Sequence, residues 1–161
     1  TCKAVELAKS YGASVEAELG VVGYDKGVES KFTEPKLAEE FYAATQVDAL
    51  AISVGNTHLE QEKATEVDTK LLSQIEKFVN CPLVIHGGSG IKNPQLYWLA
   101  KNTAICKINI GTELRQVFGE KLREYLLNNP TIFDRIEILS HVYEKTIPAT
   151  KKIILNLRPD K

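Results

Sequence analysis

An α/β fold built on a parallel sheet is predicted by two features of this 161-residue sequence. Short apolar runs alternate with segments whose apolar residues recur at helical spacing. Two of these runs, at 47–54 and 82–85, lead into turns of glycine and polar residues, as buried parallel strands do at their carboxyl ends. The alternation predicts four strands joined by helical crossovers, and the length suits one domain with a buried core.

The first half of the chain is expected to supply two of the four strands. Gly12 follows a helical pattern and ends it. Glu16 and Glu18 fall on one face of the next strand, because side chains alternate along a strand. Thr33, just before Glu34-Pro35, is expected to be an N-cap. The elements expected here are a helix at 1–11, a strand at 13–19, a loop at 20–31, a helix at 34–44 and a strand at 47–54.

The second half is expected to supply the other two strands and the longest helices. Asp68 is expected to cap a helix, and Pro148 to interrupt the last one. The elements expected here are a polar loop at 56–67, a helix at 68–78, a strand at 82–85, a helix at 94–101, a strand at 104–110, a helix at 112–127 and a last helix at 132–157.

The composition excludes several classes of partner. The net charge is −1, so neither nucleic acid nor an acidic membrane surface is an expected partner. No apolar run reaches the roughly 18 residues that a membrane-spanning helix needs, and the first residues lack the apolar centre of a signal peptide. Three cysteines are an odd number, which argues against a disulfide framework. A cytoplasmic protein is therefore expected.

Two histidines follow strands of the predicted sheet. His58 comes shortly after the run at 47–54, and His86 comes directly after the run at 82–85. Because the carboxyl ends of parallel strands meet at one rim, both imidazoles are expected to lie close together. Neutral imidazole is the commonest metal ligand in proteins. The sequence therefore predicts a metal site at this rim, whereas His141 lies in a helical region away from any strand end.

A glycine-rich turn, Gly87-Gly88-Ser89-Gly90, follows His86 without a gap. Glycines let the backbone approach an anion closely, and the serine hydroxyl adds a donor. We favour a phosphate site beside the metal. The alternative is a tight turn that needs glycine only for its geometry.

Three further residues carry polar groups toward the same rim. Glu18 lies near the carboxyl end of its strand, where its carboxylate is either functional or simply solvated. Asn109 ends the fourth strand and is placed to hydrogen-bond a substrate hydroxyl or carbonyl. Thr112 begins the next helix, whose first N–H groups either bind an anion or are capped by that threonine.

Motifs in a characteristic order cover nearly the whole chain, at 15–20, 32–35, 47–58, 82–90 and 107–115. Together they resemble the class II, zinc-dependent ketose-bisphosphate aldolases, which include the fructose-bisphosphate and tagatose-bisphosphate enzymes. The resemblance implies a (β/α)8 TIM barrel. Residues 1–161 would then form a single domain, the C-terminal part of that barrel, with about the last four strand–helix units and the C-terminal helices.

The resemblance also implies roles for individual residues. His58 and His86 would bind Zn²⁺, with Glu18 at an alternative metal position, and a second, monovalent cation is an optional addition. Arg135 would reach the far phosphate of the substrate, often across a dimer interface. Asn109 and Glu18 are the candidate catalytic residues. The dihydroxyacetone phosphate portion would be held by Gly87, Gly88, Ser89, Asn109, Gly111 and Thr112.

The activity that the resemblance implies is aldol cleavage and condensation of a ketose 1,6-bisphosphate, in glycolysis and gluconeogenesis. The metal would polarise the ketose carbonyl, and the phosphate site would fix the substrate against it. The expected substrate is fructose 1,6-bisphosphate, cleaved to dihydroxyacetone phosphate and glyceraldehyde 3-phosphate; the tagatose isomer is the alternative. Because half a barrel leaves two sheet edges open, a homo-oligomer of two or more copies, or a partner segment, is expected.

Several positions depart from the family pattern. The family's first metal histidine and its neighbouring catalytic aspartate belong to a part of the barrel that this sequence does not contain. Leu59 replaces a glycine, and Arg135 lacks the proline that usually precedes it. The loop at 23–27 is shorter and less acidic than the family's proton-transferring loop, which leaves Asp25 or Glu29 as substitutes. Weak or no activity is therefore expected from this chain alone.

Two other interpretations remain open. One is a non-catalytic aldolase remnant or interaction module, which Leu59 and the short loop favour. The other is a different phosphate-binding barrel enzyme that uses no metal. Zinc binding by the two histidines would argue against both.

Overall fold

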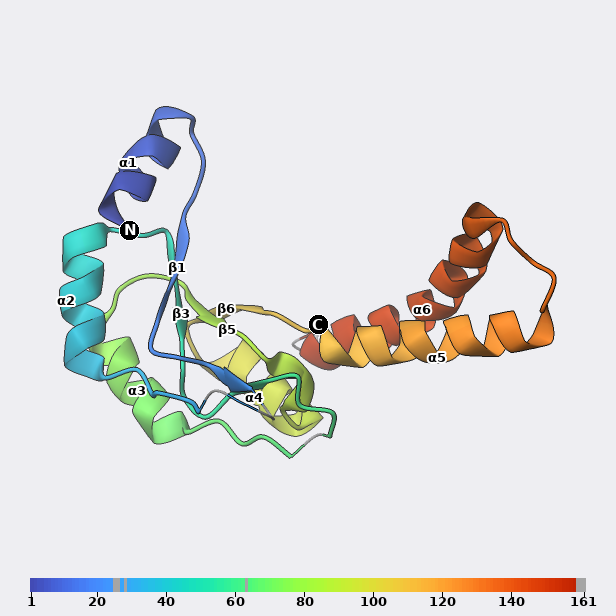
Figure 1. Ribbon diagram of the computed structural model, residues 1–161. Helices are drawn as coiled ribbons and strands as arrows, with labels where there is room; N and C mark the ends of the chain where they lie inside the picture. Colours follow the sequence, from blue (N-terminus) through green and yellow to red (C-terminus); the bar gives the residue numbers. More distant parts are fainter. Residues whose placement is uncertain (25–26, 28, 63, 159–161) are drawn as a thin grey trace.

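A four-stranded parallel sheet forms the centre of the computed structural model, which describes residues 1–24, 27, 29–62 and 64–158 (Figure 1). Each strand pairs with the next one in the order β1-β3-β5-β6, and every pairing is parallel. This confirms the predicted sheet, with strands shorter than expected. The strands are β1 (Glu16–Leu19), β3 (Ala49–Ile52), β5 (Leu83–Ile85) and β6 (Ile105–Ile108).

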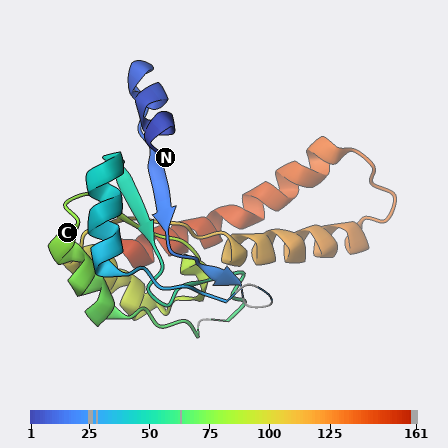
Figure 2. The same cartoon turned by 60° about the vertical axis from the view of Figure 1, so that its left-hand side comes forward.

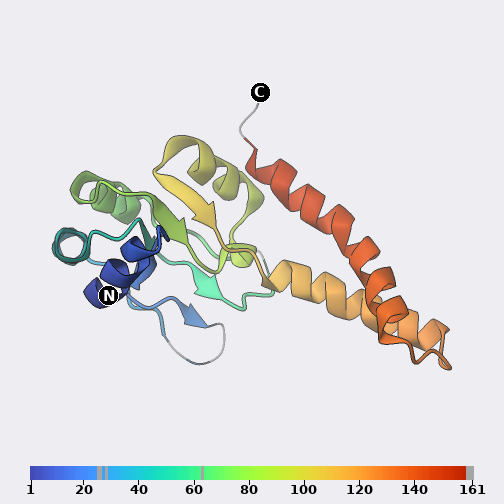
Figure 3. The same ribbon diagram turned by 90° about the horizontal axis from the view of Figure 1, so that it is seen from above.

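Helices alternate with these strands, as the sequence pattern predicts, and three of them (α2, α3 and α4) gather around the sheet (Figure 3). Within the described residues, no helix is both long enough and apolar enough to cross a membrane. The helices are α1 (Cys2–Ser10), α2 (Pro35–Thr45), α3 (Thr69–Phe78), α4 (Asn93–Asn102), α5 (Thr112–Asn128) and α6 (Arg135–Leu157).

The two faces of the sheet differ in character. Alternate residues such as Leu50 and Ile85 are fully buried in the core with side chains of α3 and α4. The opposite face carries charged side chains, and Lys107 Nζ lies 2.7 Å from Glu16 Oε2. This ion pair joins β1 to β6, the two outer strands, which in a flat sheet would be about 14 Å apart. The sheet therefore curves toward its charged face, so that the two outer strands approach each other on that side. The inside of a barrel has this curvature.

A second, smaller pairing lies beyond the main sheet. β2 (Gly23–Tyr24) and β4 (Thr57–His58) run parallel, with Tyr24 opposite His58. The sequence predicted only loops at 20–31 and 56–67, and this part of the prediction was wrong. Strands of two residues are too short to show any periodicity, and they form because the tertiary fold brings both loops to the same rim.

Two of the three predicted helix caps also need correction. Asp68 caps α3, since its Oδ1 accepts hydrogen bonds from the N–H groups of Lys70 and Leu71. Thr33 does not cap α2, whose N-cap is Glu34. Thr112 is the first residue of α5 rather than its cap, a place taken by Gly111. The buried Thr33 hydroxyl instead links the ends of β1 and β3.

Helices α5 and α6 form an antiparallel arm that projects away from the sheet (Figures 1 and 2). The carboxyl-terminal part of α6 returns and packs against α4. Pro148 lies inside α6 without interrupting it, contrary to expectation. Burial of Val142 and Ile153, on either side of the proline, holds the helix together despite the hydrogen bond that proline cannot donate.

Candidate metal centre

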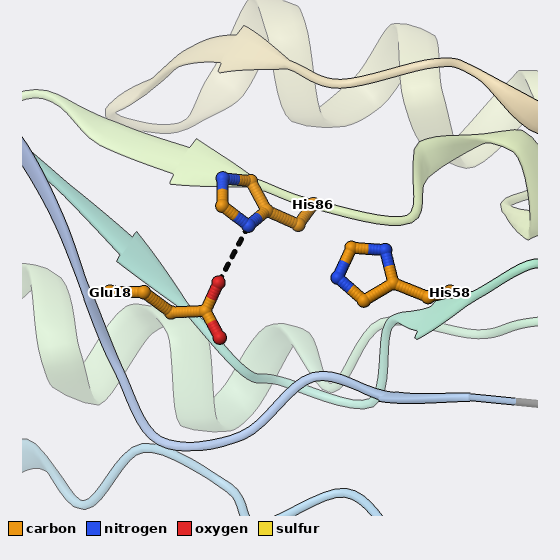
Figure 4. Close-up of side chains that lie close together, drawn as sticks. All are labelled: Glu18, His58 and His86. Atoms are coloured by element: carbon orange, nitrogen blue, oxygen red, sulfur yellow. Dashed lines mark ion pairs between the residues drawn. The ribbon is translucent and has the colours of Figure 1, made fainter. Parts of the chain in front are cut away.

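Glu18, His58 and His86 converge at the carboxyl ends of β1, β4 and β5 (Figure 4). One potential ligand atom from each residue lies within 4.8 Å of the others. The His58 and His86 ring centroids are 5.9 Å apart. The structure therefore brings together the three side chains that the sequence singled out for metal binding.

Two carboxylates hold the His86 ring. Its Nδ1 lies 2.6 Å from Glu18 Oε2, and its Nε2 lies 3.1 Å from Glu16 Oε1. Burial raises the pKa of Glu16, but hydrogen bonds and charge from Lys107 and His86 outweigh this, so its pKa lies below the usual value. An ionised Glu16 accepts a hydrogen bond from a proton on His86 Nε2, and Nδ1 then faces the other two side chains.

His58 is held on the opposite side of the cluster. Its ring lies 5.1 Å from the Tyr24 ring, across the β2–β4 pairing. Burial lowers the pKa of His58, and the positive charges of His86 and Arg115 lower it further against the opposing effect of Glu18. The ring therefore stays neutral to a lower pH than an exposed histidine, and the neutral ring is the form that binds metals.

Asn56 fixes the loop that leads to His58. Its side chain is fully buried, and Nδ2 donates to the His86 carbonyl oxygen at 2.9 Å. Its Oδ1 accepts from the Val54 N–H at 2.8 Å. One amide side chain thus connects the backbone segments that carry both histidines.

The glycine turn packs against its neighbours so closely that side chains would not fit. Gly87 has a left-handed backbone (φ = 68°), and a Cβ there would collide with the carbonyl group of Thr57. The Gly88 N–H donates to the Asn109 carbonyl oxygen at 3.0 Å. Ser89 Oγ accepts from the Glu113 N–H at 3.3 Å. These bonds place the turn directly beside the start of α5.

The other predicted site residues fall into three groups. Asn109, Gly111 and Thr112 follow β6 at the glycine turn, since Asn109 is hydrogen-bonded to Gly88 and Ile85, Gly111 caps α5 and Thr112 is its first residue. Arg135 is the first residue of α6, a helix that begins at the outer end of the arm, away from the cluster (Figure 1). Asp25 lies outside the described residues, and Glu29 is exposed.

The donor set matches a transition-metal site. Two imidazoles and one carboxylate are ligands that zinc commonly takes, and three protein ligands are typical of a catalytic zinc site. Two donors on one zinc ion lie at most about 4 Å apart, so a separation of 4.8 Å needs only a small adjustment of side chains. The carboxylate behind His86 completes the arrangement that usually orients a metal-bound histidine.

Sequence reasoning missed three supporting residues. Tyr24 faces His58 only because of the β2–β4 pairing, and Lys107 reaches Glu16 across 91 positions of sequence. Neither contact leaves a local pattern. Asn56 lies in a segment that the sequence presents as a polar loop, so its burial left no local pattern either.

Comparisons with known proteins show what this chain is similar to in sequence and in fold. The family model of class-II fructose-bisphosphate aldolases matches residues 1–159. The chain is also similar to the crystal structure of the YdjI aldolase of Escherichia coli K12, with 28% identity and a TM-score of 0.74, covering 96% of this chain and 52% of that one.

Two further solved structures have lower sequence identity to this chain and are similar to it in fold. One is a fructose-bisphosphate aldolase of Campylobacter jejuni, with 22% identity, a TM-score of 0.70, and coverage of 96% of this chain and 54% of that one. The other is a candidate fructose-1,6-biphosphate aldolase of Coccidioides immitis, with 23% identity, a TM-score of 0.80, and coverage of 96% and 55%. The chain thus spans about half the length of these solved structures.

Proposed function

The chain belongs to the class-II fructose-bisphosphate aldolase family, and from this premise we propose that it supplies the metal-binding part of an enzyme that cleaves ketose 1,6-bisphosphates. The observation that supports this most directly is the convergence of Glu18, His58 and His86 beside the glycine turn. In this proposal, residues 1–161 form one domain, the C-terminal part of an aldolase barrel.

Zn²⁺ is the proposed metal, held by His58 and His86 with Glu18 as third or alternative ligand. When bound, it would act as the Lewis acid that polarises the substrate carbonyl. Glu16 keeps His86 in the tautomer that binds metal, and Lys107 keeps Glu16 ionised. A monovalent cation beside the phosphate is an optional part of the proposal.

The substrate would be positioned by the rim around this cluster. Asn109 would donate its side-chain amide to a substrate oxygen, and Glu18 is the nearest carboxylate for moving a proton. One phosphate group would be bound by Gly87, Gly88, Ser89, Asn109, Gly111 and Thr112. The hydrogen bonds from Gly88 to Asn109 and from Glu113 to Ser89, which join the glycine turn to the start of α5, support this assignment.

Fructose 1,6-bisphosphate is the proposed substrate, cleaved in glycolysis and formed in gluconeogenesis, with tagatose 1,6-bisphosphate as the alternative. Arg135 begins the helix that starts at the outer end of the arm. Arg135 would therefore contact the far phosphate of a substrate bound to a second copy of the chain. A homo-oligomer is for this reason part of the proposal.

Zinc titration of the metal-free chain by calorimetry tests the proposal. We expect one zinc ion per chain, with affinity at least about tenfold weaker in His58→Ala and in His86→Ala, because each removes a ligand. His141→Ala is the matched control, since His141 stacks on Tyr125 in the arm. Equal loss in all three variants, or no zinc binding at all, would contradict the metal centre.

Activity separates the enzyme from a non-catalytic remnant, the second candidate that Leu59 favours. Cleavage of fructose 1,6-bisphosphate with added zinc is expected to be weak but abolished by His86→Ala. Tight zinc binding without any cleavage would favour the remnant.

A further inference from the structure

The two histidines of the metal centre are held in different ways. His86 has a carboxylate on each ring nitrogen, Glu18 at 2.6 Å and Glu16 at 3.1 Å, and Figure 4 shows the first of these pairs. Among the described residues, none forms a hydrogen bond or an ion pair with either ring nitrogen of His58. Metal-binding histidines usually have one nitrogen fixed by a neighbouring polar group. The orientation of His58 therefore depends on contacts of the ring itself.

Tyr24 packs against the ring of His58. The two ring centroids are 5.1 Å apart, and the ring planes are inclined by 34°. The His86 ring is the second neighbour, at 5.9 Å and 39°. Ring pairs at these separations attract each other and prefer particular relative orientations. The plane of the His58 ring is therefore restricted by two aromatic contacts, of which Tyr24 is the one that is not a proposed metal ligand.

The segment that carries Tyr24 is fastened to the rest of the rim. β2 runs parallel to β4, with Tyr24 opposite His58. Earlier in the same segment, Val21 exchanges two backbone hydrogen bonds with Lys31, both at 2.8 Å. The Val21 carbonyl oxygen also accepts from Ser53 Oγ, just after β3, at 3.0 Å. These hydrogen bonds fix the backbone that places the Tyr24 ring beside His58.

The hydrophobic core does not account for the position of the Tyr24 side chain. It is 46% exposed and is not one of the core residues, whereas Val22, which is 3% exposed, anchors this segment. Within the ranges that the structure describes, the Tyr24 hydroxyl forms no hydrogen bond. The contact that the side chain does make is the one between its ring and the ring of His58.

We propose that Tyr24 is a positioning residue for His58, whose ring plane it fixes so that one nitrogen faces the position shared with Glu18 and His86. The inference rests on the proposed function, because a bound metal ion is what the oriented ring serves. The second side-chain torsion of histidine has a broad preference, so packing decides the ring plane. A ligand that is already oriented loses less conformational freedom when it binds. Ring packing thus does for His58 what the Glu16 hydrogen bond does for His86.

Zinc titration of the metal-free chain by calorimetry tests the positioning role. Tyr24→Ala is expected to weaken zinc binding about three- to tenfold, because the imidazole is then free to turn away. Tyr24→Phe keeps the ring and is expected to bind zinc like the unmodified chain. Tyr11→Ala is the control, since Tyr11 is 81% exposed at the end of α1. Circular dichroism checks that each variant is folded.

Double variants show whether Tyr24 acts through His58. In the His58→Ala chain, Tyr24→Ala is expected to cause no further loss of zinc affinity, because the ring that it positions is gone. In the His86→Ala chain, the same substitution is expected to weaken binding about three- to tenfold again. Equal losses in both chains would assign Tyr24 to general stability of the rim and overturn the proposal. So would a loss in Tyr24→Phe as large as that in Tyr24→Ala.

Nuclear magnetic resonance of the metal-free chain tests the ring contact itself. Tyr24→Ala is expected to shift the carbon-bound ring protons of His58, which lie in the ring current of Tyr24. The signals of His141, which stacks on Tyr125, are expected to stay in place. Unmoved His58 signals would overturn the proposal.

Failure of this inference and failure of the proposed function give different results. Zinc binding that Tyr24→Ala leaves unchanged would overturn the positioning role alone. Absence of zinc binding in the unmodified chain would contradict the proposed function and overturn the positioning role with it.

Discussion

At the scale of single residues, Leu59 is the clearest point of strain. Its φ of 58° is costly for a branched apolar side chain, and nearly half of that side chain is exposed, so little burial compensates. Leu59→Asn is expected to raise the free energy of unfolding by about 0.5–1 kcal/mol, because asparagine adopts this conformation more readily. Urea denaturation of the metal-free chain measures the change.

A second exposed leucine gives the control for this prediction. Leu7 lies in α1 with ordinary helical geometry and 62% exposure. Leu7→Asn is expected to be neutral or slightly destabilising, since asparagine is a weaker helix former. A loss of stability in Leu59→Asn larger than that in Leu7→Asn would show that packing of Leu59 outweighs its backbone strain.

The residues of the site differ in how far the sequence predicted them. His58 and His86 each follow an apolar run, so the meeting of their rings needed only the rule that parallel strands end at one rim. The contacts that orient His86 could not be predicted in this way. Glu16 and Lys107 lie on opposite outer strands, and their ion pair depends on how strongly the sheet curves.

At the scale of elements, the buried hydroxyl of Thr33 joins two strands. It donates to the Leu19 carbonyl oxygen at 2.6 Å and accepts from the Ser53 N–H at 2.8 Å. Thr33→Val keeps the shape but leaves both groups unpaired, so we expect a loss of about 1–3 kcal/mol in the free energy of unfolding. Thr33→Ser keeps the hydroxyl and is the control in the same denaturation experiment.

The comparison of these two variants decides what Thr33 does. A much smaller loss in Thr33→Ser than in Thr33→Val is the expected result if the hydrogen bonds matter most. Equal losses would mean that the methyl group, and not the hydroxyl, stabilises the junction of β1 and β3.

Elements whose apolar residues recur at a regular spacing were predictable from the sequence. Elements that form only through tertiary contacts were not. The pattern predicted four strands and their helices, because each buries one apolar face. It did not predict β2 and β4, which have two residues each. The predicted N-cap of α2 was wrong by one residue. The Thr33 hydroxyl forms hydrogen bonds with two backbone groups at the junction of β1 and β3 instead. No local sequence pattern reveals these contacts.

At the scale of the whole molecule, the fold leaves surfaces that one copy does not cover. β1 and β6 are the outer strands of the main sheet, so each has one edge without a partner in that sheet. The arm projects away from the sheet (Figure 2). Apolar side chains along α6 are exposed. Open sheet edges and exposed apolar side chains are both typical of a chain that is stable when it pairs with another segment or with a second copy.

We expect the chain to self-associate through the exposed face of α6. Leu139, Tyr143 and Ile147 recur at helical spacing and are 49%, 69% and 36% exposed. Arg135 precedes them on the same helix, so pairing through this face would bring it toward a second copy. Light scattering is expected to give a mass well above that of one chain, and Leu139→Lys to lower it toward a monomer, because a charge in an apolar contact is costly. Leu7→Lys on α1 is the control. A compact monomer without substitution would contradict self-association, and an oligomer that Leu139→Lys leaves intact would assign the contact to the sheet edges instead of the arm.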